Sequence, residues 1–125
     1  AAPTKAASPV HDLRVALVQG DTRWHDPAGN RDYYGELIAP LAGRSDLVVL
    51  PETFTSGFSN EALASAEDVQ GPTVAWIREQ ARALDAAVCG SVQRRIDAAQ
   101  AAREGIALGV YNRLLLATPD GALIH

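Results

Sequence analysis

Two short apolar segments with an amphipathic segment between them restrict the folds open to this chain. Residues 13–19 and 46–50 are apolar at most positions, which is typical of strands. The first run lacks strict alternation, so we expect this strand to be covered on both faces. Residues 26–41 carry apolar side chains at helical spacing: Tyr34, Leu37, Ile38 and Leu41. A strand, a helix and a strand within roughly forty residues form a βαβ unit with parallel strands. The sequence therefore predicts an α/β fold.

Capping and turn residues set the boundaries of the expected elements. Asp26 and Pro27 are a typical helix start, and Pro40 is expected to end or kink that helix. A second helix is expected to begin at residues 71–73. Residues 94–104 are charged and alanine-rich, which fits either a short solvated helix or a mobile excursion. The remaining expected elements are strands at 86–93 and 111–117, a turn at 118–121 and a strand from 123.

Size, charge and cysteine content limit the function classes. The chain has 125 residues, 47% of them hydrophobic, enough for one domain with a packed core. A formal charge of -4, without a block of either sign, argues against nucleic acid and membrane partners. Cys89 is the single cysteine, which excludes an internal disulfide framework and favours a cytoplasmic location. No apolar run approaches the roughly 18–20 residues of a membrane span. Residues 1–12 are expected to be a flexible tail.

We expect the chemistry of this chain at Glu52. The apolar run 47–50 leads directly into Pro51 and Glu52. We expect Glu52 to be held out of water at the tip of this strand, where a carboxylate costs free energy unless something binds or uses it. In open α/β sheets, ligands bind beyond the carboxyl ends of the strands, where Glu52 is expected to lie. The structural alternative is that Glu52 caps the following turn through amides near Thr55 or Gly57.

Other residue types with reactive side chains give weaker signals. Cys89 stands within an expected strand with no histidine close in sequence, so we expect a small packed side chain rather than a nucleophile. The histidines do not have the spacing of metal ligands: His11, His25 and His125. No glycine-rich phosphate loop follows the first strand. The sequence therefore predicts neither a metal site nor a cofactor.

Residues 49–58 (VLPETFTSGF) resemble the first catalytic motif of the nitrilase superfamily of carbon–nitrogen hydrolases. The TSGF continuation resembles the omega-amidase branch of that superfamily. Further matching segments occur in the expected order at residues 15–19, 90–92, 111–114 and 119–121. The resemblance extends over residues 13–125 and assigns them to the amino-terminal part of a carbon–nitrogen hydrolase domain. Residues 94–109 depart from it, because they are longer than the expected hairpin loop.

The resemblance implies a nitrilase-type α-β-β-α sandwich, of which this chain supplies roughly the first half. It implies catalysis by a glutamate, a lysine and a cysteine, with Glu52 as the general base and acid and the other two residues beyond His125. The implied substrate is a small amide, such as the terminal amide of a carboxylic or 2-oxo acid. The implied assembly is a homodimer or a higher homo-oligomer. Phe58, as a pocket wall, and Asn112, beside the carboxylate, are the candidates for substrate binding.

Two other functions stay open on the sequence. If the chain ends at His125, the lysine and cysteine are missing, and the chain is a non-catalytic α/β half-domain or a dimerisation module. A glycosidase that uses Glu52 needs a second carboxylate roughly 5–9.5 Å away. No second acidic residue at a strand end is evident as its partner.

Overall fold

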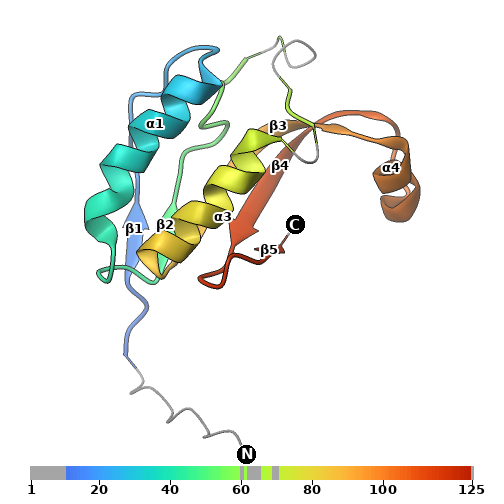
Figure 1. Cartoon of the computed structure of the whole chain (residues 1–125). Helices are drawn as coiled ribbons and strands as arrows, with labels where there is room; N and C mark the ends of the chain where they lie inside the picture. Colours follow the sequence, from blue (N-terminus) through green and yellow to red (C-terminus); the bar gives the residue numbers. More distant parts are fainter. Residues whose placement is uncertain (1–10, 60, 62–65, 69–70, 125) are drawn as a thin grey trace, which may run out of the picture.

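The molecule is built on one mixed sheet, shown in Figure 1. A computed structural model describes residues 11–59, 61, 66–68 and 71–124, so most of the expected tail at 1–12 lies outside the described residues. The sheet has five strands in the order β1-β2-β3-β4-β5. The first three are parallel, and β4 and β5 pair antiparallel. The strands are β1 (Val15–Leu17), β2 (Leu47–Val49), β3 (Ala87–Ile96), β4 (Gly109–Ala117) and β5 (Leu123–Ile124).

Two helices, α1 (Pro27–Ile38) and α3 (Pro72–Leu84), cross one face of the sheet (Figure 1). Asp26 caps α1 by accepting a hydrogen bond from the amide of Gly29 at 3.1 Å, as predicted. Pro40 lies in a 3-10 turn, Ala39–Leu41, where α1 ends. Helix α3 ends at Leu84, and the next residue, Asp85, caps its last turn with a left-handed backbone (φ 49°). The predicted βαβ unit is confirmed, and a second crossover follows it.

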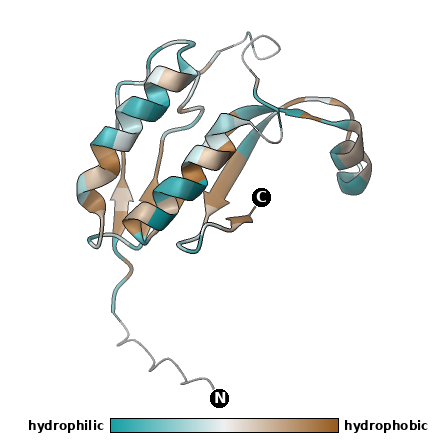
Figure 2. Cartoon of the chain, viewed as in Figure 1, coloured by the Kyte–Doolittle hydropathy of each residue, from teal (hydrophilic) through white to brown (hydrophobic). Residues whose placement is uncertain are grey.

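The core lies between these helices and the sheet. Apolar side chains of both helices point toward the strands, and Figure 2 shows the hydrophobic strand residues beneath them. Burial of this apolar surface is the main stabilising contribution to such a layer. The largest fully buried apolar side chains are Tyr34, Phe54, Ile38, Ile77, Leu115 and Val48.

The opposite face of the sheet is open among the described residues. Directly paired residues point to the same side of a sheet, and one such row runs across all the strands: Leu17, Val49, Cys89, Leu116 and Ile124. Leu17 is 78% exposed and Ile124 51% exposed. The prediction that the first strand is covered on both faces is therefore wrong for this part of the chain, because helices cover one face only.

Strands β3 and β4 extend beyond the helical layer and carry a short helix, α4 (Ala98–Glu104), at their far end (Figure 1). Both strands are longer than predicted, because they pair continuously from Val88 with Ala117 to Ile96 with Gly109. Asp97 caps α4 by accepting from the amide of Gln100. Residues 98–104 thus form the short helix, one of the two alternatives for this segment.

Charged side chains secure the base of this extension. The guanidinium of Arg113 donates two hydrogen bonds to the carboxylate of Glu104, at 2.6 and 2.9 Å. Arg94 is fully buried, and this burial lowers the pKa of its guanidinium, as does the positive charge of Arg113. The carboxylates of Glu67 and Glu104 act in the opposite direction. The extension is therefore held by ion pairing as well as by the strand ladder.

Candidate functional site

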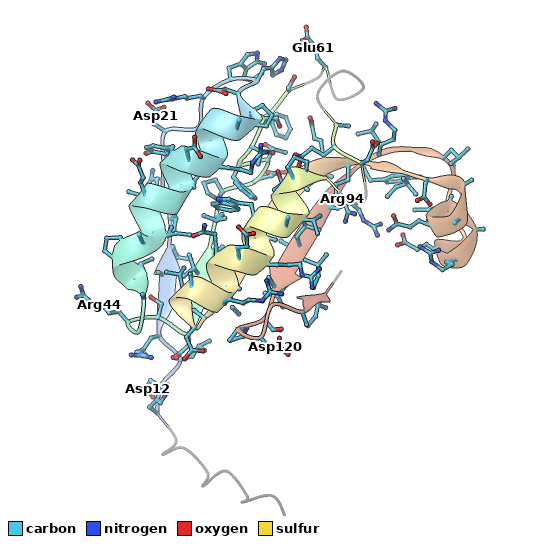
Figure 3. The ribbon with its side chains drawn as sticks, viewed as in Figure 1. Asp12, Asp21, Arg44, Glu61, Arg94 and Asp120 are labelled. Carbon is cyan, nitrogen blue, oxygen red and sulfur yellow. The ribbon has the colours of Figure 1, made fainter. Side chains whose placement is uncertain are left out.

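Glu52 lies at the carboxyl end of β2, after Leu50 and Pro51, as predicted. The loops that follow β1 and β2 meet at this end of the sheet; in Figure 3, Asp21 and Glu61 mark it, and Arg44 and Asp120 mark the opposite end. The side chain of Glu52 is exposed. The prediction that it is held out of water is therefore wrong for the described residues. The physical reason is that Glu52 contacts the open face of the sheet, which no helix covers.

The carboxylate of Glu52 has one polar partner among the described residues. The Nδ2 amide of Asn112, on β4, donates a hydrogen bond of 2.7 Å to Oε1 of Glu52. Side chains along β4 alternate between the two faces of the sheet. Leu115 is buried on the helical face, whereas Asn112 lies on the open face with Leu114, which is 64% exposed. The structure thus brings together two of the predicted site residues, although 60 positions separate them in sequence.

The backbone directly after Glu52 adopts an unusual conformation. Thr53 has φ 48°, in the left-handed region that β-branched residues rarely adopt. Its amide donates to Oγ of Ser91 on β3 at 2.9 Å, and its hydroxyl donates to the carbonyl of Glu52 at 2.8 Å. Strained backbone of this kind persists where surrounding contacts fix it, and such residues cluster at functional sites.

The loop from Phe54 to Ser59 is held by burial in the core and by hydrogen bonds from two separate elements. Phe54 is fully buried in the core. The side-chain amide of Asn30, on α1, donates to the carbonyl of Thr55 at 2.8 Å. The side-chain amide of Gln93, on β3, donates to the carbonyl of Ser59 at 2.9 Å. The loop that carries Glu52 is therefore fixed from both the helical layer and the sheet.

Phe58, the last residue of the motif at residues 49–58, is 75% exposed. Trp24, from the loop after β1, is 63% exposed and stacks on His25 with the ring centroids 4.8 Å apart. His25 contacts Ser59 through Nε2 and Oγ at 2.6 Å. The role of Phe58 as a pocket wall stays a prediction, and so does a substrate contact for Asn112.

The anchoring residues Asn30, Ser91 and Gln93 were not singled out from the sequence. Each of them hydrogen-bonds to the segment after Glu52, at a position 25 to 38 residues away in sequence. The one available signal was alternation along β3, which places Ser91 and Gln93 on the same face as Cys89. Nothing in the sequence indicated that this face runs beside Glu52.

Cys89 lies near the start of β3, paired with Val49 on one side and Leu116 on the other. Burial raises the pKa of its thiol, which disfavours the reactive thiolate. Both observations agree with the expectation of a packed side chain. Lys5 is the single lysine of the sequence and lies outside the described residues.

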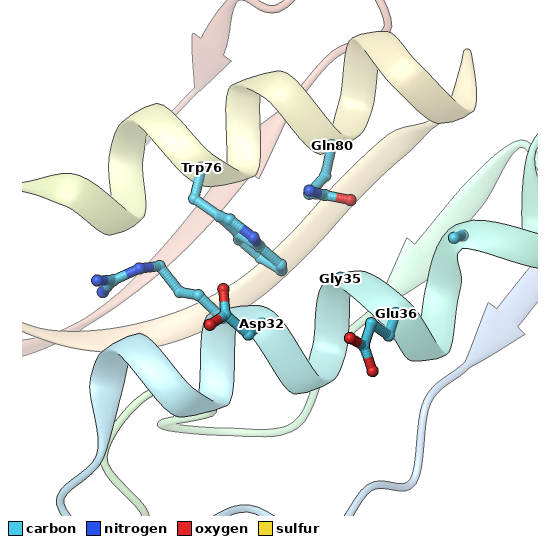
Figure 4. A pocket seen from close by; sticks show the side chains of 7 residues that line it. Asp32, Gly35, Glu36, Trp76 and Gln80 are labelled. Carbon is cyan, nitrogen blue, oxygen red and sulfur yellow. The ribbon is translucent and has the colours of Figure 1, made fainter.

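One cavity lies in the helical layer. It has a volume of about 510 Å³ and lies between α1 and α3, and Figure 4 shows the lining residues Asp32 and Glu36 on α1 and Trp76 and Gln80 on α3. Glu52 is not among its lining residues. Within the described ranges, no three side chains of the metal-binding types form a cluster. The same ranges contain no helix long and apolar enough to cross a membrane.

Similar proteins agree with this architecture. The sequence profile of the carbon-nitrogen hydrolase family matches residues 14–125. Omega-amidase YafV of Escherichia coli is 33% identical over 111 residues, which are 89% of this chain and 39% of that protein. A CN-hydrolase superfamily protein of Xanthomonas campestris, whose crystal structure has an arsenic adduct in the active site, is 68% identical. It superposes with a TM-score of 0.81 over 92% of this chain and 40% of its own.

The fold is also that of more distant nitrilase-superfamily proteins. Nit3 of Saccharomyces cerevisiae, a member of branch 10 of that superfamily, superposes with a TM-score of 0.75 at 21% identity. The match covers 90% of this chain and 42% of Nit3. The chain therefore spans about 40% of the length of the proteins it matches. The predicted nitrilase-type fold is confirmed, and the chain belongs to the carbon–nitrogen hydrolase family.

Proposed function

We propose that this chain is the part of an omega-amidase-like enzyme that supplies the proton-transferring carboxylate, Glu52. The proposed substrate is the terminal amide of a small carboxylic or 2-oxo acid. The observation that carries the proposal is the fixed position of Glu52 at the carboxyl end of β2, oriented by Asn112 at 2.7 Å. The similarity to omega-amidase YafV supports the reaction class.

In the proposed reaction, a cysteine thiolate attacks the amide carbonyl to form an acyl-enzyme, and the nitrogen leaves as ammonia. Glu52 takes the thiol proton, returns it to the leaving nitrogen and then removes a proton from the water that releases the acid. A lysine stabilises the oxyanion of the tetrahedral intermediate. The lysine and cysteine are expected beyond His125, as the family resemblance implies. This chain is then inactive alone, because it holds the base without the nucleophile.

The exposure of Glu52 is compatible with this role. A proton-transferring group has to reach the substrate, and here the carboxylate stands on a face of the sheet that is open among the described residues. The same carboxylate forms no ion pair with a described residue. A glutamate that served only to stabilise the turn would be expected to accept bonds from the loop amides, whereas Glu52 accepts from Asn112 on β4.

The competing function is a non-catalytic half-domain or a dimerisation module. It requires that the complete polypeptide lack the lysine and cysteine. The open apolar row of the sheet would suit a packing surface, but it does not explain the anchoring of Glu52. A homo-oligomeric state and a cytoplasmic location stay predictions.

The test is the substitution Glu52→Gln in the complete polypeptide, with ammonia release from a glutaramate-type amide as the measurement. Glutamine keeps the shape of the side chain but cannot transfer the proton. We expect kcat to fall about 10²–10⁴-fold, the usual contribution of general acid–base catalysis. The matched control is Glu36→Gln, an exposed carboxylate on α1, which should leave kcat unchanged. Turnover retained by Glu52→Gln would overturn the proposed role.

A further inference from the structure

We propose that Asn112 is the positioning residue of Glu52: it holds Oε1 and leaves Oε2 as the oxygen that transfers the proton. The inference rests on the proposed function and adds to it the assignment of the two carboxylate oxygens. Asn112 donates to Oε1 at 2.7 Å, and Oε2 accepts no hydrogen bond from the described residues. A carboxylate with one oxygen engaged and the other free has a defined direction of proton transfer.

Asparagine suits this task chemically. Its side-chain amide is neutral and does not titrate near neutral pH, so it donates a hydrogen bond without competing for the proton. A positively charged donor at the same place would favour the ionised carboxylate more strongly and weaken it as a base. Asn112 therefore orients Glu52 while leaving the proton to the reacting groups.

The strand that carries Asn112 gives it a fixed position. Asn112 pairs with Gln93 inside the continuous β3–β4 ladder, which runs for several residues on either side of this pair. Gln93 itself donates to the carbonyl of Ser59, in the loop that begins at Glu52. The donor and the loop are thus attached to the same pair of strands, so their separation is set by the sheet.

A second anchor acts on the backbone of the same residue. Ser91, on β3, accepts a hydrogen bond from the amide of Thr53, whose left-handed φ of 48° turns the chain directly after Glu52. The side chain is held by β4 and the peptide by β3. Reactive groups held at both ends lose little orientation during the reaction, which is the condition for an effective proton transfer.

The experiment compares kcat and KM of the complete polypeptide with those of Asn112→Leu, using a glutaramate-type amide. Leucine has a similar size and no donor. We expect kcat to fall about 10–100-fold, as for other residues that orient a reacting group, and KM to change less than about twofold, because Asn112 contacts Glu52 rather than substrate. The matched control is Gln80→Leu, which removes a side-chain amide from α3 and should leave both constants unchanged.

Two further variants separate positioning from a structural role. Asn112→Leu added to Glu52→Gln should lower the residual rate no further, because the effect of Asn112 passes through the carboxylate. Asn112→Asp places two carboxylates in contact. Activity should therefore be low at neutral pH, where both are charged, and should recover at acid pH, where one shared proton bridges them. Thermal unfolding of each variant verifies that the exposed site tolerates the changes.

Each outcome decides between the two proposals. If Glu52→Gln is inactive and Asn112→Leu retains its kcat, the positioning inference is overturned and the proposed function stands. If Asn112→Leu raises KM at unchanged kcat, Asn112 binds substrate and the inference is overturned as well. If Glu52→Gln retains turnover, the proposed function fails and the inference fails with it. Loss of kcat alone, with no further loss in the double variant, supports both.

Discussion

Single residues in this chain gain their roles from partners far away in sequence. Glu52 and Asn112 meet across the sheet, and Thr53 keeps its left-handed backbone because Ser91 binds its amide. Each of these contacts joins a loop to a strand of the sheet. The position of the candidate base is therefore as well defined as the sheet itself, although its side chain is exposed.

Asp46 provides a pH-dependent contact at the opposite end of the sheet. Its carboxylate accepts hydrogen bonds from the side chain of Arg14 at 3.0 and 3.3 Å and from the Arg14 amide at 2.8 Å. These bonds from Arg14 lower the pKa of Asp46 from 3.8 to about 2. A carboxyl group with a lowered pKa stabilises the folded state above its ordinary pKa and loses this contribution as pH falls toward the folded value.

We predict that Asp46→Asn lowers the thermal midpoint of unfolding at pH 6 and that this deficit shrinks between about pH 4 and pH 2. The effect should be modest and should weaken in salt, because the pair lies at the surface. Thermal unfolding of both proteins across this pH range tests the prediction. A deficit that is constant with pH would show that Asp46 acts through something other than its charge.

At the scale of whole elements, the sequence predicted whether a segment is a helix or a strand better than it predicted where that helix or strand ends. Asp26, Pro27 and Pro40 marked α1 correctly because capping and proline effects are local. The ends of β3 and β4 were missed because continuous pairing to Ile96 and Gly109 depends on contacts between strands, not on local preference. The exposure of Glu52 was missed for a related reason: local pattern does not report which face of a sheet is covered.

Close packing between β3 and the loop after β2 gives a prediction at this scale. A Cβ atom at Gly90 would lie 2.8 Å from Cδ1 of Phe54 and 3.0 Å from Cβ of Leu50. Gly90→Ala should therefore lower the free energy of unfolding by about 1–3 kcal/mol through overpacking. Because Phe54 belongs to the loop of Glu52, the substitution should also lower kcat of the complete polypeptide.

Urea unfolding and amide hydrolysis measure the two effects of Gly90→Ala. Gly109→Ala, on β4, is the matched control, because its nearest neighbour would be an ordinary contact at 3.9 Å with Tyr111. The control should change stability by less than about 0.5 kcal/mol. Equal stabilities for both alanine variants would show that Phe54 relaxes away from position 90 without cost.

On the scale of the molecule, the two faces of the sheet are unequal. Helices α1 and α3 bury one face, while an apolar row whose ends are the exposed Leu17 and Ile124 lies on the face that is open among the described residues. Exposed apolar surface of this kind usually marks a face that contacts something else. We expect a further layer to cover this face, because the similar structures match this chain over only about 40% of their own length.

This asymmetry predicts how stability responds to truncated side chains in the complete polypeptide. Leu17→Ala should lower the free energy of unfolding by about 2–5 kcal/mol if a further layer buries this position. Leu37→Ala, on the outer surface of α1 and 44% exposed, is the matched control and should cost under about 1 kcal/mol. Urea unfolding of both variants provides the measurement, and equal small losses would contradict coverage of the open face.

The 60-residue separation between Glu52 and Asn112 has a consequence for biosynthesis. During synthesis, Glu52 leaves the ribosome well before Asn112. The contact between them also requires that β3 and β4 pair. Contacts of such long sequence separation form late, because closing large loops is slow. A nascent chain therefore forms the contact between Glu52 and Asn112 only after most of this sheet has assembled, and under the proposed function catalytic competence then depends on completed folding.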